Sequence, residues 1–191
     1  MNLPNKLTLL RIILVPVFLV IFNFEIFWLA GVVFVIASFT DLADGKIARK
    51  YNLVTNFGKF ADPLADKLLV CAALIALSST GMLGIPLLGM WATFIIIARE
   101  FMVTGIRLIA AAEGKVIAAG MSGKIKTTIQ MISIIYILFS DLVISLLTVM
   151  GLPLIIHDIL VNVLVTASVV MTVYSGAEYL IQNRALLDTN K

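Results

Sequence analysis

Six long apolar runs fill most of this chain, and short polar stretches separate them. Each run approaches or exceeds the ~20 residues that a helix needs to cross the hydrocarbon core of a bilayer. The pattern therefore predicts an all-α integral membrane protein with six transmembrane helices. The opening residues 2–11 mix polar and apolar positions and predict a short amphipathic N-terminal segment at the membrane surface. The runs cover about residues 7–24, 26–42, 60–79, 85–112, 125–150 and 152–181.

The composition agrees with this pattern. Of the 191 residues, 61% are hydrophobic and 13% are charged, and the mean hydropathy is +1.11. These values are typical of a polytopic membrane protein and leave no room for a separate soluble domain. We therefore expect residues 1–191 to form a single membrane-embedded domain.

The basic residues gather at alternate ends of the predicted helices. The opposite side carries little charge beyond Glu25, Asp141 and Asp158. The positive-inside rule then places both termini in the cytoplasm and predicts a multi-pass protein of the cytoplasmic membrane. This orientation and anionic lipid headgroups explain the net charge of +3, so we expect membrane lipids and no nucleic acid as partners.

Four aspartates interrupt the apolar pattern: Asp41 and Asp44 at the end of the second run, and Asp62 and Asp66 near the start of the third. An Asp at the centre of a bilayer costs about 2.5–3.5 kcal/mol, so four of them imply compensating partners, most simply divalent cations. On helices, spacings of three and four place each pair on one face, and two such helices would bring four carboxylates together. Helix caps and surface ion pairs explain single acids better than this pattern of four.

Small and basic residues accompany the acids. Gly45 and Ala48 share the face of the first pair, and Gly58 lies one turn before Asp62. Their lack of bulk leaves a slot in which phosphate groups of a ligand can approach. Arg49 and Lys67 add positive charge on either side.

Residues 41–66 contain the pattern D-x2-D-G-x2-A-R-x8-G-x3-D-x3-D with every fixed position occupied. Eight fixed positions make this a specific signal. The pattern resembles the signature of the CDP-alcohol phosphotransferase family, and the six-helix layout extends the resemblance over most of the chain. The resemblance implies the fold of that family and a single catalytic domain. It also implies transfer of a phosphoalcohol from a CDP-linked donor to an acceptor hydroxyl, with CMP as leaving group.

The resemblance further implies an active site that faces the cytoplasm and holds two Mg²⁺ or Mn²⁺ ions. Carboxylate oxygens suit such hard ions, and a metal pair would neutralise the pyrophosphate. Asp41, Asp44, Asp62 and Asp66 would bind the metals, and Asp66 would act as general base. A homodimer is the expected assembly. The residues that would contact the CMP portion are Gly45, Ala48, Arg49 and Gly58.

A second polar cluster bears on the acceptor. Arg99 and Glu100 interrupt the fourth run, Arg107 follows two turns later, and Lys124 and Lys126 begin the fifth. We expect the four basic residues to form a pocket that faces the acids and binds the phosphate of an acceptor. The competing interpretation treats the lysines as positive-inside markers at helix ends.

Three segments resemble the branch of the family that uses CDP-diacylglycerol as donor and sn-glycerol 3-phosphate as acceptor. They are PNKLTLLR at 4–11, AREFMVTGIR at 98–107 and SGKIKT at 122–127. In that branch the amino-terminal segment lies beside the active site, which makes Asn5, Thr8 and Arg11 candidate ligand contacts. Lys67 is a further candidate, because it adds positive charge beside the acids. An N-cap role for Asn5 or Thr8 and a snorkelling Arg11 are comparable interpretations.

Two alternatives stay open. The same chemistry with serine, inositol phosphate or phosphatidylglycerol as acceptor would make the basic cluster less necessary or differently used. A divalent cation transporter is the alternative from another class, because acids inside helices also mark ion pathways. The nearly uncharged outer halves of the second to fourth runs argue against a continuous pathway.

Overall fold

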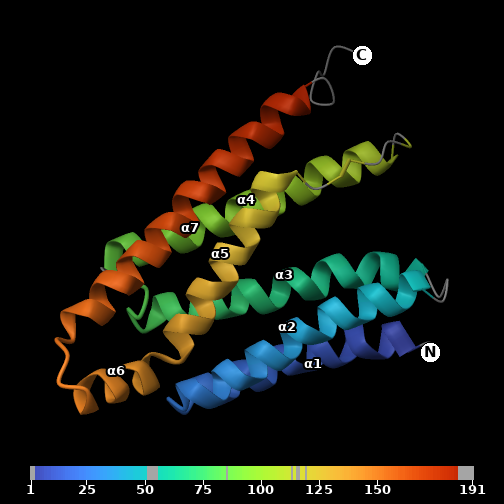
Figure 1. Ribbon diagram of the computed structural model, residues 1–191. Coiled ribbons are helices and arrows are strands. Elements are labelled where there is room, and N and C mark those ends of the chain that lie inside the picture. Colours follow the sequence, from blue (N-terminus) through green and yellow to red (C-terminus); the bar gives the residue numbers. More distant parts are fainter. Residues whose placement is uncertain are drawn as a thin grey trace. The chain divides into compact units, whose positions relative to one another are not determined.

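The structure, a computed structural model, describes residues 3–50, 56–84, 86–112, 114, 117–118 and 120–184. Within these ranges it describes all side chains except those of residues 3, 4, 41–50, 56–63, 66, 86 and 112. The described residues form α-helices and contain no strand (Figure 1). The helices are α1 (Leu3–Asn23), α2 (Phe27–Lys50), α3 (Asn56–Ser79), α4 (Pro86–Ala112), α5 (Met121–Leu138), α6 (Ser140–Val149) and α7 (Ile155–Gln182).

The described helices follow the predicted apolar runs, but some boundaries differ and one run is bent. Helix α2 continues beyond the expected end at Leu42 as far as Lys50, and α3 begins at Asn56, ahead of the expected Phe60. The fifth run is not one straight helix, because α5 and α6 meet at an angle of 63° around Phe139. At this bend the Ser140 hydroxyl donates to the carbonyl of Ile137, a local bond of the kind that competes with regular helical pairing.

The expected count of six spans is not confirmed. Among the described residues, two helices are long and apolar enough to cross a membrane, or three if the bent pair α5 and α6 counts as one span. The described apolar parts of α2 and α3 are shorter, Phe27–Thr40 and Lys67–Ser79. Helix α1 is continuous from Leu3, so the expected amphipathic N-terminal segment forms its first turns and is not a separate helix.

The chain divides into two compact units, each built from two stretches of sequence. Unit 1 comprises Met1–Thr80 and Ile134–His157, and unit 2 comprises Gly81–Ser133 and Asp158–Lys191. Unit 1 thus contains α1, α2, α3 and α6, whereas unit 2 contains α4 and most of α5 and α7. The single catalytic domain expected from the sequence stays a prediction.

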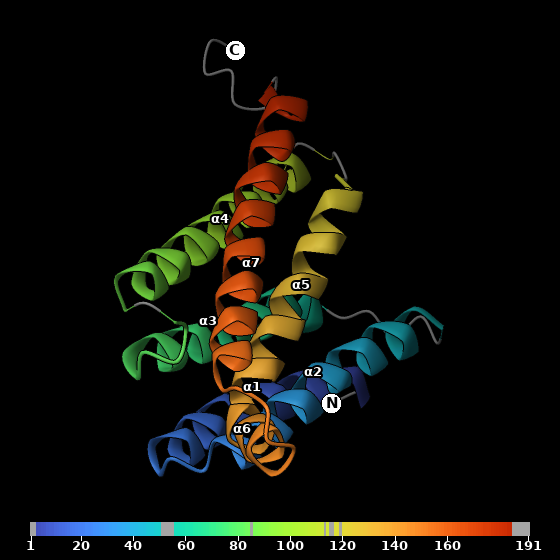
Figure 2. The same ribbon diagram turned by 60° about the vertical axis from the view of Figure 1, so that its left-hand side comes forward.

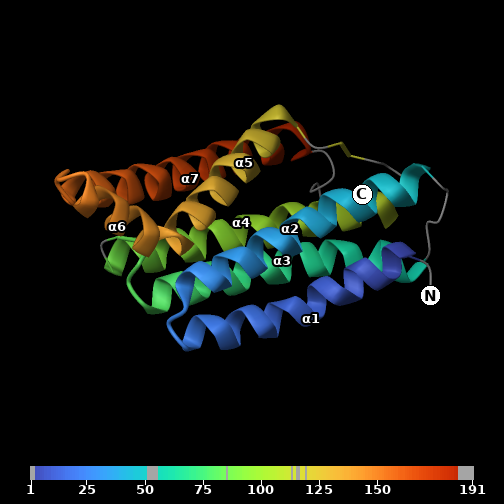
Figure 3. The same ribbon diagram turned by 60° about the horizontal axis from the view of Figure 1, so that its bottom comes forward.

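In unit 1, α1 packs against both α2 and α3. Figures 1 and 3 show these three helices side by side, with the start of α1, the end of α2 and the start of α3 at the same end of the group. Aromatic side chains fill the space between α1 and α2: the Phe18 ring centroid lies 5.9 Å from that of Phe22 and 6.2 Å from that of Phe34. This packing holds α1 against α2, the helix that carries the first pair of aspartates.

Unit 2 gathers α4, α5 and α7 (Figure 2). The Ser133 hydroxyl on α5 lies 2.9 Å from the Ser168 hydroxyl on α7 and donates to the carbonyl of Leu164 at 3.2 Å. Helix α4 meets α7 at Gly176, where an added Cβ would lie 3.1 Å from Cγ of Arg99. Small and hydroxyl-bearing residues therefore let the three helices approach closely, as is usual between membrane helices.

The aromatic contact in unit 1 gives a test of the packing. Phe18 is fully buried, whereas Phe24 is 70% exposed. We expect Phe18→Ala to lower the free energy of unfolding in detergent by about 3–5 kcal/mol, because it leaves a cavity between α1 and α2. The matched control Phe24→Ala should change it by no more than about 0.5 kcal/mol. Equal losses in the two variants, measured by denaturant titration, would contradict this packing.

Candidate functional site

The eight residues of the signature pattern lie on two neighbouring helices of unit 1. Helix α2 carries Asp41 to Arg49 in its last turns, and α3 carries Gly58, Asp62 and Asp66 in its first turns. The helices that the spacing argument requires are therefore present, and their pattern-bearing ends lie at one end of the unit (Figure 3). The side chains of the four aspartates and of Gly45, Ala48, Arg49 and Gly58 lie outside the described residues.

Among the side chains that are described, which exclude these aspartates, no group of three or more His, Cys, Asp or Glu gathers to hold a metal ion. The expected metal ligands therefore rest on their sequence positions and on the two helices that carry them. Lys67 follows Asp66 on α3 and is half-buried, and it has an interaction partner.

The first turns of α1 carry three polar side chains that are buried. Asn5, Thr8 and Arg11 recur every three residues and are all buried, with Arg11 only 1% exposed. Burying a guanidinium is costly unless polar or charged partners replace its water, and none of the three side chains lacks a partner. A snorkelling arginine would expose its charged group, which Arg11 does not do. These candidate ligand contacts therefore belong to the packed interior beside α2 and α3.

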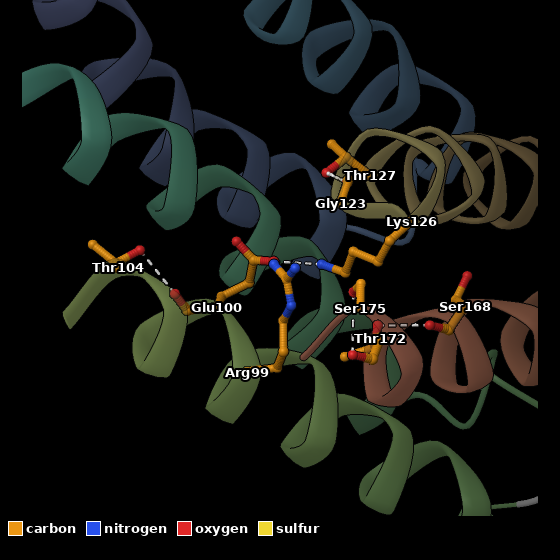
Figure 4. Close-up of polar contacts among 9 residues, drawn as sticks. All are labelled: Arg99, Glu100, Thr104, Gly123, Lys126, Thr127, Ser168, Thr172 and Ser175. Atoms are coloured by element: carbon orange, nitrogen blue, oxygen red, sulfur yellow. Dashed lines mark hydrogen bonds and ion pairs between the residues drawn. The ribbon is translucent and has the colours of Figure 1, made fainter. Parts of the chain in front are cut away.

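The second polar cluster lies in unit 2, where one carboxylate receives two cations. Glu100 Oε1 on α4 accepts from Lys126 Nζ on α5 at 2.5 Å and from Arg99 Nη1 at 3.2 Å. Figure 4 shows the Lys126 side chain extending to the Glu100 carboxylate, with the Arg99 guanidinium beside it. Lys126 is 1% exposed and Arg99 and Glu100 are mostly buried. The three charges thus form a compact, water-poor cluster between two helices.

The other two basic residues of the expected pocket have different surroundings. Arg107 lies eight residues beyond Arg99, which is about 12 Å along a helix. Its guanidinium carbon lies 5.6 Å from the centre of the Tyr179 ring on α7, a cation–π contact. Lys124 has an exposed side chain. The structure thus brings Arg99 and Lys126 together, and it gives Arg107 an aromatic neighbour.

Some residues around this cluster were given no role from the sequence. Glu100 is the first: an acid inside an apolar run implied a partner, but nothing in the sequence named Lys126. The second group is a polar stripe on α7 that consists of Ser168, Thr172 and Ser175. Their spacings of four and three residues place them on one helix face. Their hydroxyls bond along this face, Thr172 to the carbonyl of Ser168 at 2.6 Å and Ser175 to that of Thr172 at 3.3 Å.

The comparison with protein families gives the class of protein. The sequence model of the CDP-alcohol phosphatidyltransferase family matches residues 1–174. The chain belongs to this family. The family predicted from the eight-residue pattern is therefore confirmed.

The names of individual relatives are more specific than the name of the family. A protein of Bacillus subtilis (strain 168) named CDP-diacylglycerol--glycerol-3-phosphate 3-phosphatidyltransferase is 44% identical, over 99% of this chain and 98% of its own. A protein of the same name from Rickettsia typhi is 38% identical, over 93% of this chain and 94% of its own. A Mycobacterium tuberculosis protein named probable phosphatidylglycerophosphate synthase is 38% identical, over 98% of this chain and 83% of its own.

Proposed function

We propose that this chain transfers the phosphatidyl group of CDP-diacylglycerol to sn-glycerol 3-phosphate, giving phosphatidylglycerol phosphate and CMP. The observation that carries the proposal is the complete eight-residue pattern on the ends of α2 and α3 that lie together in unit 1. The names of relatives that are 38–44% identical over nearly the whole chain support both the donor and the acceptor.

The pyrophosphate of the donor requires positive charge, for which the family implies divalent metal ions. The donor set fits, since Asp41, Asp44, Asp62 and Asp66 offer only the hard carboxylate oxygens that Mg²⁺ or Mn²⁺ prefers, and two adjacent helices carry them. Two bound ions would neutralise the pyrophosphate and the departing CMP. The buried Arg11 on α1 supports anionic surroundings at this end of unit 1.

The transfer itself exchanges one phosphorus–oxygen bond for another. The acceptor hydroxyl oxygen attacks the phosphorus nearer the lipid, and its bond to that phosphorus forms as the bond to the bridging oxygen breaks. CMP leaves with the bridging oxygen and its electron pair. Asp66 takes the proton of the attacking hydroxyl as general base. Gly45, Ala48, Arg49 and Gly58 contact the CMP portion in this proposal.

The acceptor differs from a simple alcohol because it carries its own phosphate. We assign binding of this phosphate to Arg99, Arg107, Lys124 and Lys126, and further ligand contacts to Asn5, Thr8, Arg11 and Lys67. Support comes from the near-complete burial of Lys126, because a charged side chain buried within a membrane protein is usually functional. Charge-assisted bonds from Arg and Lys are the strongest that a phosphate can accept.

The reaction is tested by CMP release from purified protein in detergent with CDP-diacylglycerol, Mg²⁺ and different acceptors. We expect release to require glycerol 3-phosphate. Asp66→Asn should lower the rate by about 10²–10⁴-fold, because it removes the proton acceptor and a metal ligand. Release with serine or inositol phosphate instead would keep the chemistry and reject the acceptor. No release with any acceptor, together with cation uptake into liposomes, would favour a transporter.

Metal removal gives an independent test of the aspartates. Excess EDTA should abolish CMP release, and added Mg²⁺ or Mn²⁺ should restore it, because the pyrophosphate is otherwise not neutralised. Asp41→Asn and Asp62→Asn should raise the metal concentration needed for half-maximal rate. Full activity in EDTA would exclude the metal-dependent mechanism.

We also propose six membrane crossings, both termini and the active site on the cytoplasmic side, and a homodimer. The support is the alternation of basic residues along the chain and, for the dimer, the family resemblance. Alkaline phosphatase, which is active only outside the cytoplasm, should be active when fused at Gly81 and inactive when fused after Arg184. Light scattering in detergent should give twice the mass of one chain. The reverse fusion pattern would contradict the topology, and the mass of one chain would contradict the dimer.

A further inference from the structure

Glu100 is the common point of the charged cluster in unit 2. Its Oε1 atom accepts from a neighbour on its own helix, Arg99, and from Lys126, which is 26 residues away on α5. An acid at this place reduces the positive charge of a site that is proposed to attract a phosphate. Its presence therefore needs an explanation other than charge attraction.

The explanation lies in the flexibility of the lysine side chain. An ammonium on a four-carbon stem samples many positions, whereas a fixed carboxylate oxygen holds it at one. We propose that Glu100 is a positioning residue that holds the Lys126 ammonium and the Arg99 guanidinium as a preformed pair of donors for the acceptor's phosphate. The identity of this anion rests on the proposed function. The role of Glu100 rests on the contacts within unit 2.

Two properties of the cluster favour the binding of an anion. Two cations share one carboxylate, so these three side chains carry a formal charge of +1. Arg99 Nε is buried and has no hydrogen-bond partner, although Nη1 donates to Glu100. The guanidinium therefore has one N–H donor, at Nε, to which no acceptor is bonded. A phosphate that takes this bond satisfies an atom that is otherwise buried at a cost.

Two glycines from neighbouring helices leave the space that Arg99 occupies. A Cβ at Gly176 on α7 would lie 3.1 Å from Arg99 Cγ and 3.6 Å from Met102 Cε. A Cβ at Gly123 on α5 would lie 3.7 Å from Arg99 Nη2, which is an ordinary contact. An alanine at 176 therefore presses on the stem of Arg99, whereas an alanine at 123 is tolerated. Helix packing and Glu100 together determine where the guanidinium lies.

The test compares Glu100→Gln with the conservative Glu100→Asp. We expect Glu100→Gln to raise the KM for glycerol 3-phosphate about tenfold or more, because it loses the charged acceptor that fixes both donors. The KM for CDP-diacylglycerol should stay within about twofold. Glu100→Asp keeps the charge and should raise the acceptor KM less. The matched control is Glu178→Gln, whose carboxylate on α7 accepts from Gln182 at 3.1 Å, and its acceptor KM should not change.

A purely structural role for Glu100 gives a different result. It predicts that Glu100→Gln lowers the unfolding temperature and the amount of active enzyme while the remaining enzyme keeps its acceptor KM, and this result would overturn the proposal. Gly176→Ala supplies a second variant in case Glu100→Gln does not fold. It should raise the acceptor KM severalfold, with Gly123→Ala as its control. An unchanged acceptor KM in Gly176→Ala and in Glu100→Asp would also overturn the proposal.

A binding assay separates this inference from the proposed function. Equilibrium dialysis of radiolabelled glycerol 3-phosphate, without CDP-diacylglycerol, measures the anion site directly. Turnover by wild type with an unchanged acceptor KM in Glu100→Gln would reject the positioning role alone. Absence of turnover by wild type, with binding that weakens in Glu100→Gln, would reject the proposed reaction and support the positioning role. Absence of binding to wild type would overturn the positioning role.

Discussion

Charged groups inside the apolar helices of this protein need partners where they lie, and this constraint shapes both polar clusters. The apolar surroundings provide no water to solvate such groups. A carboxylate, an ammonium or a guanidinium is therefore stable there only beside polar or charged partners. Glu100 meets Lys126 and Arg99 in unit 2. Arg11 is buried on α1, which packs against α2 and α3, the helices whose sequence supplies four acids. Both candidate binding regions are thus built around buried charge.

The same lack of water explains why the sequence predicted some helix boundaries well and others poorly. Each described helix corresponds to a predicted apolar run, with α5 and α6 sharing one, and the end of α3 at Ser79 and of α4 at Ala112 agree with the expected boundaries. Helix α2 continues through the charged pattern to Lys50, because helical hydrogen bonds satisfy the backbone even where hydropathy falls. The bend at Phe139 could not be predicted in this way, because no proline or glycine lies near it in the sequence. Hydropathy records burial in lipid and does not record helix direction.

Part of the candidate site could likewise be predicted from the sequence, and part of it could not. Spacing alone assigned each aspartate pair to one helix face, because three and four residues correspond to about one helical turn. The pairing of Glu100 with Lys126 was beyond the sequence, since it depends on how α4 and α5 are rotated toward each other. The polar stripe of Ser168, Thr172 and Ser175 on α7 contains part of that information, as it identifies the face that packs inward. Local periodicity thus predicts faces, and tertiary contacts decide which faces meet.

The alternation of the chain between the two units constrains its biosynthesis. Unit 1 takes its first stretch from Met1–Thr80 and its second from Ile134–His157, so synthesis passes through α4 and most of α5 before that unit is complete. A growing chain therefore contains α1, α2 and α3 before α6, which packs against α2, has been made. Unit 2 in turn is completed by α7, the last helix among the described residues. Both units therefore complete their contacts only after residues beyond Ser133 have been synthesised.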